Sequence, residues 1–312
     1  MVIARGAGES KVVPHRGSDD DVTLQWGSWM TTSSTYRVAA VQMEPKLGRL
    51  DDNLRRIVDG LRTAASQGAH LVVFPECALS GYGFSSRDEG MAHAVNVDGP
   101  KVREVVSACA SSRCYCIFGL LERDGSRLFN ACVLVGPDGL VGSYRKVHLP
   151  FLGIDMFVDP GDRPFAVHDA GGLRVGMHIC YDGSFPESGR VLTLLGADLL
   201  VLPTNWPTHS ECAAEHMIPT RAMENTVYAM AVNRVGHESG FRFIGTSSIA
   251  DPSGRVLARA GEDAEEILFP EVDTARARQK HLVRVPGRHE IDRIRDRRPR
   301  FYDFLVAPNG RD

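Results

Sequence analysis

Three reactive side chains in this sequence lie far apart along the chain, each at or near the end of a strand-like apolar run. They are the carboxylate of Glu76, the ammonium of Lys146 and the thiol of Cys180. A thiolate can attack an amide-like carbon, and a carboxylate can move the protons that this reaction displaces. An ammonium can stabilise the resulting oxyanion and favour an ionised resting thiol. The three residue types together predict covalent catalysis.

Each of these residues also has an ordinary explanation when it is taken alone. Cys180 could be an inert buried thiol, although it precedes a helix-like segment and would lie near unpaired backbone N–H groups. Glu76 could be a turn or capping carboxylate, and most lysines in an alternating strand such as that of Lys146 face solvent. The functional interpretation therefore depends on all three residues meeting in the fold.

Buried strands and amphipathic helices alternate in the first half of the chain. Continuous apolar runs at residues 38–41, 71–74, 116–118 and 199–202 predict strands that are covered on both faces. Apolar stripes at residues 54–65 and 102–110 predict helices, the first with Asp51 or Asp52 as its cap. Two hairpins are expected, joining residues 131–135 to 140–144 and 247–250 to 255–258. The pattern predicts a mixed α/β protein with helices covering its sheets.

Composition excludes several classes of function. The 312 residues carry a net charge of −3, and acidic residues interleave with the arginines of segment 288–300, so nucleic acid is not an expected partner. Seven scattered cysteines fit a reducing cytoplasm better than a disulfide framework. Residues 1–35 resemble neither a signal peptide nor a membrane span, and we expect no membrane partner. The histidines lack metal-ligand spacing and no phosphate loop is present, so no metal and no cofactor are expected.

Several further motifs accompany the three reactive residues in a fixed order. The segments that carry this pattern are Phe74-Pro75-Glu76, Tyr144-Arg145-Lys146, Pro160-Gly161-Asp162, His178-Ile179-Cys180-Tyr181-Asp182, Pro203-Thr204-Asn205-Trp206, Arg221-Ala222-Met223-Glu224-Asn225, Asn233-Arg234-Val235-Gly236 and Asp251-Pro252-Ser253-Gly254. From about residue 36 to about residue 305, the chain resembles the nitrilase superfamily of carbon-nitrogen hydrolases. That resemblance implies a four-layer α-β-β-α sandwich and a catalytic Glu-Lys-Cys triad.

The resemblance also implies a role for each member of the triad. Cys180 would be the nucleophile, and Glu76 would be the general base that later donates a proton to the leaving amine. Lys146 would stabilise the oxyanion together with the backbone N–H of Tyr181. Many family members carry one more glutamate six residues before the Pro-Gly pair, where this chain has Ile154. Either the neighbouring Asp155 replaces that glutamate, or the loop is organised differently.

Four residues near the motifs are candidates for substrate binding. Tyr181 adjoins the nucleophile, Asn205 and Trp206 follow a buried strand, and Tyr82 lies soon after Glu76. Aromatic residues at such positions are also common in plain hydrophobic cores, so this alternative stays open.

The sequence favours a cytoplasmic hydrolase that cleaves a linear amide or an N-carbamoyl compound through a cysteine thioester. Cys180-Tyr181-Asp182 resembles the amidase and carbamoylase branches, whereas nitrilases usually carry Cys-Trp-Glu. Nitrile hydrolysis is the alternative activity, and a catalytically silent scaffold is an alternative class that the intact triad argues against. We expect a mobile extension over residues 1–35, a hydrolase domain over 36–280 and a tail over 281–312. The tail mixes apolar and charged residues as subunit interfaces do, which predicts a homodimer or higher homo-oligomer.

Overall fold

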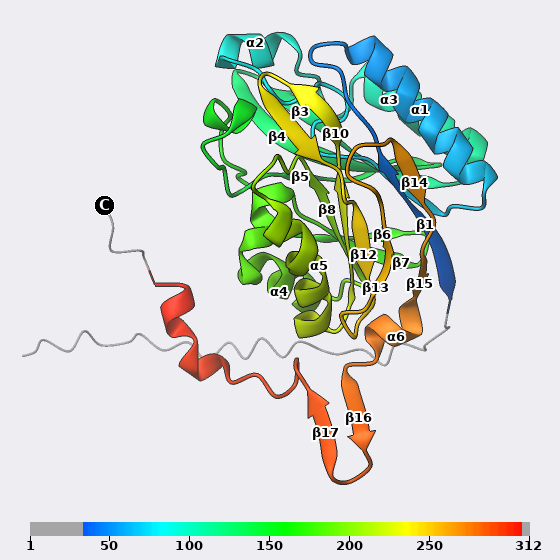
Figure 1. The fold of residues 1–312 in the computed structure, drawn as a ribbon, viewed down its shortest axis with the longest axis vertical. Helices are drawn as coiled ribbons and strands as arrows, with labels where there is room; N and C mark the ends of the chain where they lie inside the picture. Colours follow the sequence, from blue (N-terminus) through cyan, green and yellow to red (C-terminus); the bar gives the residue numbers. More distant parts are fainter. Residues whose placement is uncertain (1–33, 308–312) are drawn as a thin grey trace, which may run out of the picture. The chain divides into compact units, whose positions relative to one another are not determined.

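Two β-sheets organise the protein in the computed structural model, which describes residues 34–307 (Figure 1). The extension predicted over residues 1–35 lies almost wholly outside the described residues. In the first sheet the strand order is β14-β1-β2-β3-β4-β5, and β15 pairs with the start of β1. Its strands are β1 (Thr35–Gln42), β2 (Leu71–Val73), β3 (Tyr115–Asp124), β4 (Arg127–Gly136), β5 (Gly139–Arg145), β14 (Glu266–Leu268) and β15 (Glu271–Asp273).

The second sheet has the strand order β13-β12-β9-β8-β7-β6. Its strands are β6 (Val167–Ala170), β7 (Leu173–Met177), β8 (Leu199–Thr204), β9 (Tyr228–Asn233), β12 (Ser248–Ala250) and β13 (Val256–Arg259). In both sheets three central strands are parallel and the flanking pairs are antiparallel. Each parallel step requires a crossover, and helices supply it in this chain.

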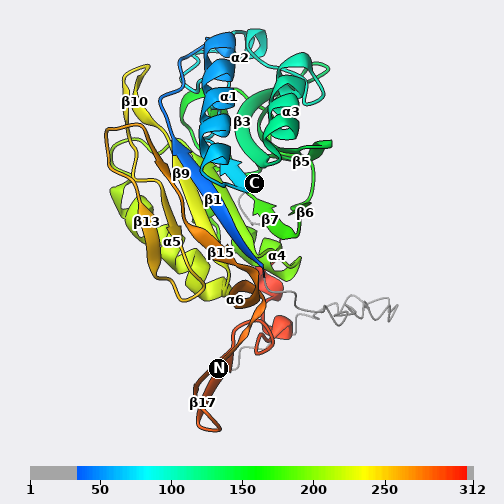
Figure 2. The same ribbon diagram turned by 90° about the vertical axis from the view of Figure 1, so that its right-hand side faces the viewer.

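Helices cover the outer face of each sheet, as Figures 1 and 2 show. The helices α1 (Leu50–Ser66) and α3 (Pro100–Ser112) cover the first sheet, while α4 (Pro186–Leu194) and α5 (Glu211–Asn225) cover the second. Alternate residues of β1 show the layering directly. Ala39 packs in a cluster with residues of α1 and α3, whereas Val38 packs in a cluster with residues of the second sheet. The predicted four-layer α-β-β-α sandwich is therefore confirmed.

The local predictions agree with this structure except at one helix cap. The four buried strands and both hairpins are present. The prediction that Asp51 or Asp52 caps the first helix is wrong, because α1 begins at Leu50 and both carboxylates lie inside its first turn. There they still interact favourably with the positive end of the helix dipole.

The C-terminal segment forms a small hairpin of its own beyond α6 (Thr274–Arg278). Its strands are β16 (His281–Val285) and β17 (His289–Asp292), and two 3-10 helices follow at Pro299–Phe301 and Asp303–Leu305. The remaining elements are α2 (Arg87–Ala92) and the hairpin of β10 (Val235–Glu238) with β11 (Phe241–Ile244). Within residues 34–307, no helix combines the length and the apolar character needed to cross a membrane.

Candidate active site

Strand direction brings Glu76 and Lys146 to the same edge of the first sheet. β2 is parallel to β3, and two successive antiparallel pairings then return β5 to the direction of β2. Glu76 follows β2 and Lys146 follows β5, so both residues leave the carboxyl ends of strands, where open sheets place their ligand sites. Gly119 of β3 makes room for this arrangement, because a Cβ there would lie 2.3 Å from the backbone nitrogen of Cys77.

A buried ion cluster forms where these strands end. The Lys146 Nζ donates to Glu76 Oε1 at 2.7 Å and to Asp155 Oδ2 at 2.5 Å, and none of the three side chains reaches solvent. Asp155 lies on the 3-10 helix Gly153–Met156, while the neighbouring Ile154 is fully buried in an apolar cluster. The structure thus places Asp155, and not residue 154, beside the lysine.

The charges of this cluster determine which of its members can exchange a proton. Burial would lower the pKa of Lys146, but Asp155 and Glu76 outweigh burial and raise it well above its ordinary value, so Lys146 is a permanent ammonium. Burial raises the pKa of Glu76, and the charge of Asp155 adds to this, while Lys146 opposes both. The net result is a Glu76 pKa above the ordinary value, which suits a general base.

Two polar side chains that the sequence did not single out for this role hold the carboxylates in place. Asn130 of β4 donates from Nδ2 to Glu76 Oε1 at 2.7 Å and to Asp155 Oδ1 at 2.8 Å. The Tyr82 hydroxyl donates to Asp155 Oδ2 at 2.8 Å. Sequence analysis missed Asn130, although an amide inside the apolar strand of residues 128–135 is a usable signal. Glu76 Oε2 has no hydrogen-bond partner among the described residues, so this oxygen can accept a proton.

Cys180 lies on the second sheet, at the turn that follows β7. It begins the 3-10 helix Cys180–Ser184, and its backbone φ is 46°, a left-handed value that costs a residue with a Cβ about 1 kcal/mol. The parallel neighbour β8 ends at Thr204, and the Thr204 side chain and the Asn205 backbone both act to lower the pKa of Cys180. Cys180 thus lies where the carboxyl ends of two adjacent parallel strands meet.

The surroundings of Cys180 favour its neutral thiol form. Burial and the negative charge of Glu76 raise its pKa to about 12, although Lys146, the Thr204 side chain and the Asn205 backbone oppose this. Lys146 does favour the thiolate, as expected, but burial and the charge of Glu76 outweigh it. A thiol with a raised pKa must lose its proton as its sulfur attacks.

The four candidate substrate-binding residues have different surroundings. Tyr181 is 40% exposed and makes an edge-to-face contact with Phe185. Asn205 is fully buried, and neither atom of its side-chain amide has a hydrogen-bond partner within residues 34–307. Trp206 is buried in the core between the sheets, and Tyr82 is turned towards Asp155. In the described part of the chain, no three His, Cys, Asp or Glu side chains are grouped so as to hold a metal ion.

Comparison with known proteins agrees with this geometry. Residues 37–281 match the model of the carbon-nitrogen hydrolase family, which covers more than half of the sequence. The chain belongs to the carbon-nitrogen hydrolase family. Within the nitrilase superfamily, this carbon-nitrogen hydrolase shares 39% identity over 267 residues with a protein of Pyrococcus abyssi named nitrilase, covering 85% of this chain and 98% of that protein.

Two further proteins that resemble this carbon-nitrogen hydrolase are named amidases. Mouse omega-amidase NIT2 is 31% identical to it over 285 residues, which cover 85% of this chain and all of the mouse protein. The fold of the amidase from Nesterenkonia sp. AN1 superposes on it with a TM-score of 0.72 at 23% identity, covering 87% and 97% of the two chains. In that solved structure the active-site cysteine carries an acetamide adduct of fluoroacetamide.

Replacement of Lys146 tests whether its ammonium acts on the nucleophile. We expect Lys146→Gln to lower kcat by at least about a hundredfold, the usual cost of losing one oxyanion donor. Because Lys146 lowers the pKa of Cys180, its loss should also move the alkylation of Cys180 by iodoacetamide to higher pH. The measurement belongs in a Cys212→Ser background, since Cys212 is the one exposed thiol among the seven cysteines.

The control for this variant addresses folding. Lys146→Gln leaves Glu76 and Asp155 buried without their cation, which is strongly destabilising. The double variant Lys146→Gln/Asp155→Asn removes the second carboxylate as well and should melt closer to the parent. An alkylation profile identical to that of the parent, in a folded variant, would show that Lys146 does not act on the thiol.

Replacement of Asn130 tests the role of Glu76 as base. In a plot of kcat/KM against pH, the acid limb should lie at a pH above 4.5, the ordinary pKa of glutamate. The reason is that Glu76 must be ionised and its pKa is raised. Asn130 stabilises the charged form of Glu76, so Asn130→Leu should raise that pKa further and shift the acid limb to higher pH. As the pH is lowered, the variant should therefore lose activity at a higher pH than the parent does. A limb that stayed in place or moved to lower pH would contradict this assignment of the base.

Proposed function

We propose that this protein hydrolyses a linear amide or an N-carbamoyl compound through a thioester on Cys180. One observation carries the proposal: a neutral buried thiol lies within the electrostatic reach of Glu76 and Lys146, and Glu76 keeps one oxygen without a protein partner. A thiol, a base with a free lone pair and a fixed ammonium are the groups that acyl transfer from nitrogen requires.

Acylation follows from the position of each group. The Cys180 sulfur bonds to the carbonyl carbon as its proton passes to Glu76. The carbonyl oxygen becomes an oxyanion that the Lys146 ammonium and the Tyr181 backbone N–H stabilise. Glu76 returns the proton to the nitrogen, the C–N bond breaks, and ammonia or an amine leaves a thioester on Cys180.

Deacylation uses the same base a second time. Glu76 accepts a proton from a water molecule whose oxygen attacks the thioester carbon, and the second tetrahedral intermediate uses the same oxyanion donors. The C–S bond then breaks and Glu76 returns the proton to the sulfur. In this scheme Asp155 fixes Lys146 and raises the pKa of Glu76 without touching the substrate.

Nitrile hydrolysis is the second candidate, because the relative from Pyrococcus abyssi is named nitrilase. The names omega-amidase and (R)-stereoselective amidase, carried by relatives of 31% and 33% identity, support the amide instead. Asp182, two residues after the nucleophile, also favours the amide, since nitrilase-type sequences usually carry glutamate there. The buried side chain of Asn205 supports a contact with the polar atoms of a bound amide.

A panel of matched substrates tests this function. We expect ammonia release with a higher kcat/KM for an amide or N-carbamoyl compound than for the nitrile with the same carbon skeleton. Cys180→Ala should abolish turnover and leave the melting temperature within a few degrees of the parent, since only a thiol is removed. Intact-mass analysis of the parent should show an acyl adduct on Cys180 alone. A higher kcat/KM for the nitrile would replace the amide with the second candidate.

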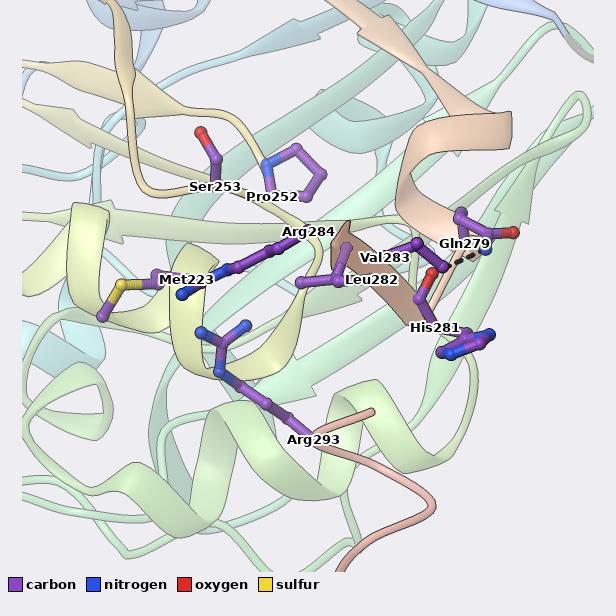
Figure 3. A pocket seen from close by; sticks show the side chains of 9 residues that line it. All are labelled: Met223, Pro252, Ser253, Gln279, His281, Leu282, Val283, Arg284 and Arg293. Carbon is purple, nitrogen blue, oxygen red and sulfur yellow. Dashed lines mark hydrogen bonds between the residues drawn. The ribbon is translucent and has the colours of Figure 1, made fainter. Parts of the chain in front are cut away.

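We further infer that the protein assembles as a homodimer or higher homo-oligomer in the cytoplasm. A pocket of about 500 Å³ lies where β16 faces the end of α5 and the turn between β12 and β13, and it contains none of the proposed site residues. Figure 3 shows Leu282 and Met223 in its wall, with Arg284 and Arg293 beside them. Val283 and Val285 of the hairpin, and Phe301 and Phe304 after it, are exposed. A second copy of the chain would cover these apolar side chains.

Seven free thiols support a reducing compartment.

Light scattering at micromolar concentration tests the assembly. We expect at least twice the 34.1 kDa mass of one chain. Val283→Asp combined with Phe301→Asp should lower the mass towards that of one chain, because both changes place charge on apolar side chains that the interface would bury. The matched control is Leu257→Asp, which changes an exposed leucine of β13. A parent protein that scatters as a monomer would refute the assembly.

A further inference from the structure

The carboxylate of Asp182 accepts four hydrogen bonds around the nucleophile. Its Oδ2 accepts from the backbone N–H of Ile179 at 2.9 Å and from the Tyr144 hydroxyl at 2.8 Å. Its Oδ1 accepts from the backbone N–H of His148 at 3.0 Å and from His148 Nδ1 at 2.7 Å. Burial would raise the pKa of Asp182, but these donors outweigh burial and lower it, so the group stays ionised.

These four donors come from both sides of the proposed site. Ile179 directly precedes Cys180 on the second sheet, whereas Tyr144 and His148 lie two residues before and two residues after Lys146. One carboxylate therefore joins the turn that carries the nucleophile to the segment that carries the ammonium. Such charge-assisted hydrogen bonds are short and directional, so the side-chain length of residue 182 determines how far apart the two segments lie.

The His148 ring is fixed from a second direction. It stacks on Phe185 with the ring centroids 3.7 Å apart, and Phe185 follows the 3-10 helix of Cys180. The nitrogen that faces Asp182 is Nδ1, a position that an asparagine Nδ2 can occupy. This allows the hydrogen bond at Nδ1 to be separated from any action of the rest of the imidazole ring.

We propose that Asp182 is a positioning residue that holds the Lys146 ammonium at its working distance from the Cys180 sulfur, with His148 as its partner on the lysine side. The effect of Asp182 on turnover rests on the proposed function, whereas its effect on the alkylation of Cys180 does not. Replacing Asp182 with glutamate keeps the charge but lengthens the side chain by about 1.5 Å. The extra length would push the two segments apart, or break one of the four hydrogen bonds.

The test compares Asp182→Glu with Asp198→Asn in the Cys212→Ser background. Asp198 is a buried carboxylate that pairs with Arg278, so its variant measures the general cost of damaging a buried acid. We expect Asp182→Glu to lower kcat by about a hundredfold, the cost of roughly one ångström of misplacement, with a much smaller change in KM. The alkylation of Cys180 should also shift to higher pH, because the ammonium lies farther from the sulfur. Asp198→Asn should change the melting temperature but not the alkylation profile.

A second pair of variants separates positioning from direct participation. His148→Asn keeps a donor at the Nδ1 position and should retain most of kcat, whereas His148→Ala should lose activity in parallel with Asp182→Glu. This pair also keeps the proposal testable if Asp182→Glu does not fold. Equal losses of kcat in His148→Asn and His148→Ala would overturn the proposal. The activity would then depend on the rest of the imidazole ring and not on the hydrogen bond at Nδ1.

Alkylation by iodoacetamide needs no substrate, so it distinguishes failure of this inference from failure of the proposed function. If the parent turned over no amide, a shifted alkylation profile in Asp182→Glu would still support the positioning role. A profile identical to that of the parent in a folded Asp182→Glu protein would overturn it.

Discussion

The buried ammonium of Lys146 is the constraint on which the rest of the site depends. An isolated charge without access to water is too costly to keep, so the fold must surround it with acceptors. Glu76 and Asp155 supply them from two different segments, and Asn130 and Tyr82 fix those carboxylates in turn. The same burial raises the pKa of Glu76, and Asp155 adds to this while Lys146 opposes both, so the burial that makes the acceptors necessary also makes Glu76 a stronger base.

The pKa of Cys180 is raised as well, which favours its neutral thiol form. In many cysteine enzymes a nearby cation or helix end stabilises a resting thiolate. Here burial and Glu76 act in the opposite sense on Cys180. In the proposed mechanism, proton removal is coupled to bond formation at the carbonyl carbon, and the unpartnered oxygen of Glu76 accepts that proton.

The strands and the reactive residues could be predicted from the sequence because both leave local signals. Glu76 and Cys180 follow apolar runs, and Asp155 lies at a fixed distance before Pro160. The role of Asn130 could not be predicted, since its partner Glu76 lies 54 residues away and only the register of β3 with β4 brings it near. The sequence indicated that Lys146 favours the thiolate of Cys180, but it could not show that burial and Glu76 outweigh this effect. A sequence shows which charges exist but not how deeply they are buried.

The proposed catalytic residues are divided between the two sheets, and therefore between the two halves of the chain. The first sheet carries the base and the ammonium, which are joined across 70 residues, and the second sheet carries the sulfur. During synthesis the first half leaves the ribosome earlier, and its hydrogen bonds can form before β7 exists. The thiol and its proposed base come together only once the two sheets dock. The proposed catalytic site is therefore completed late in folding. A truncated or half-folded chain would carry these reactive residues without bringing them together.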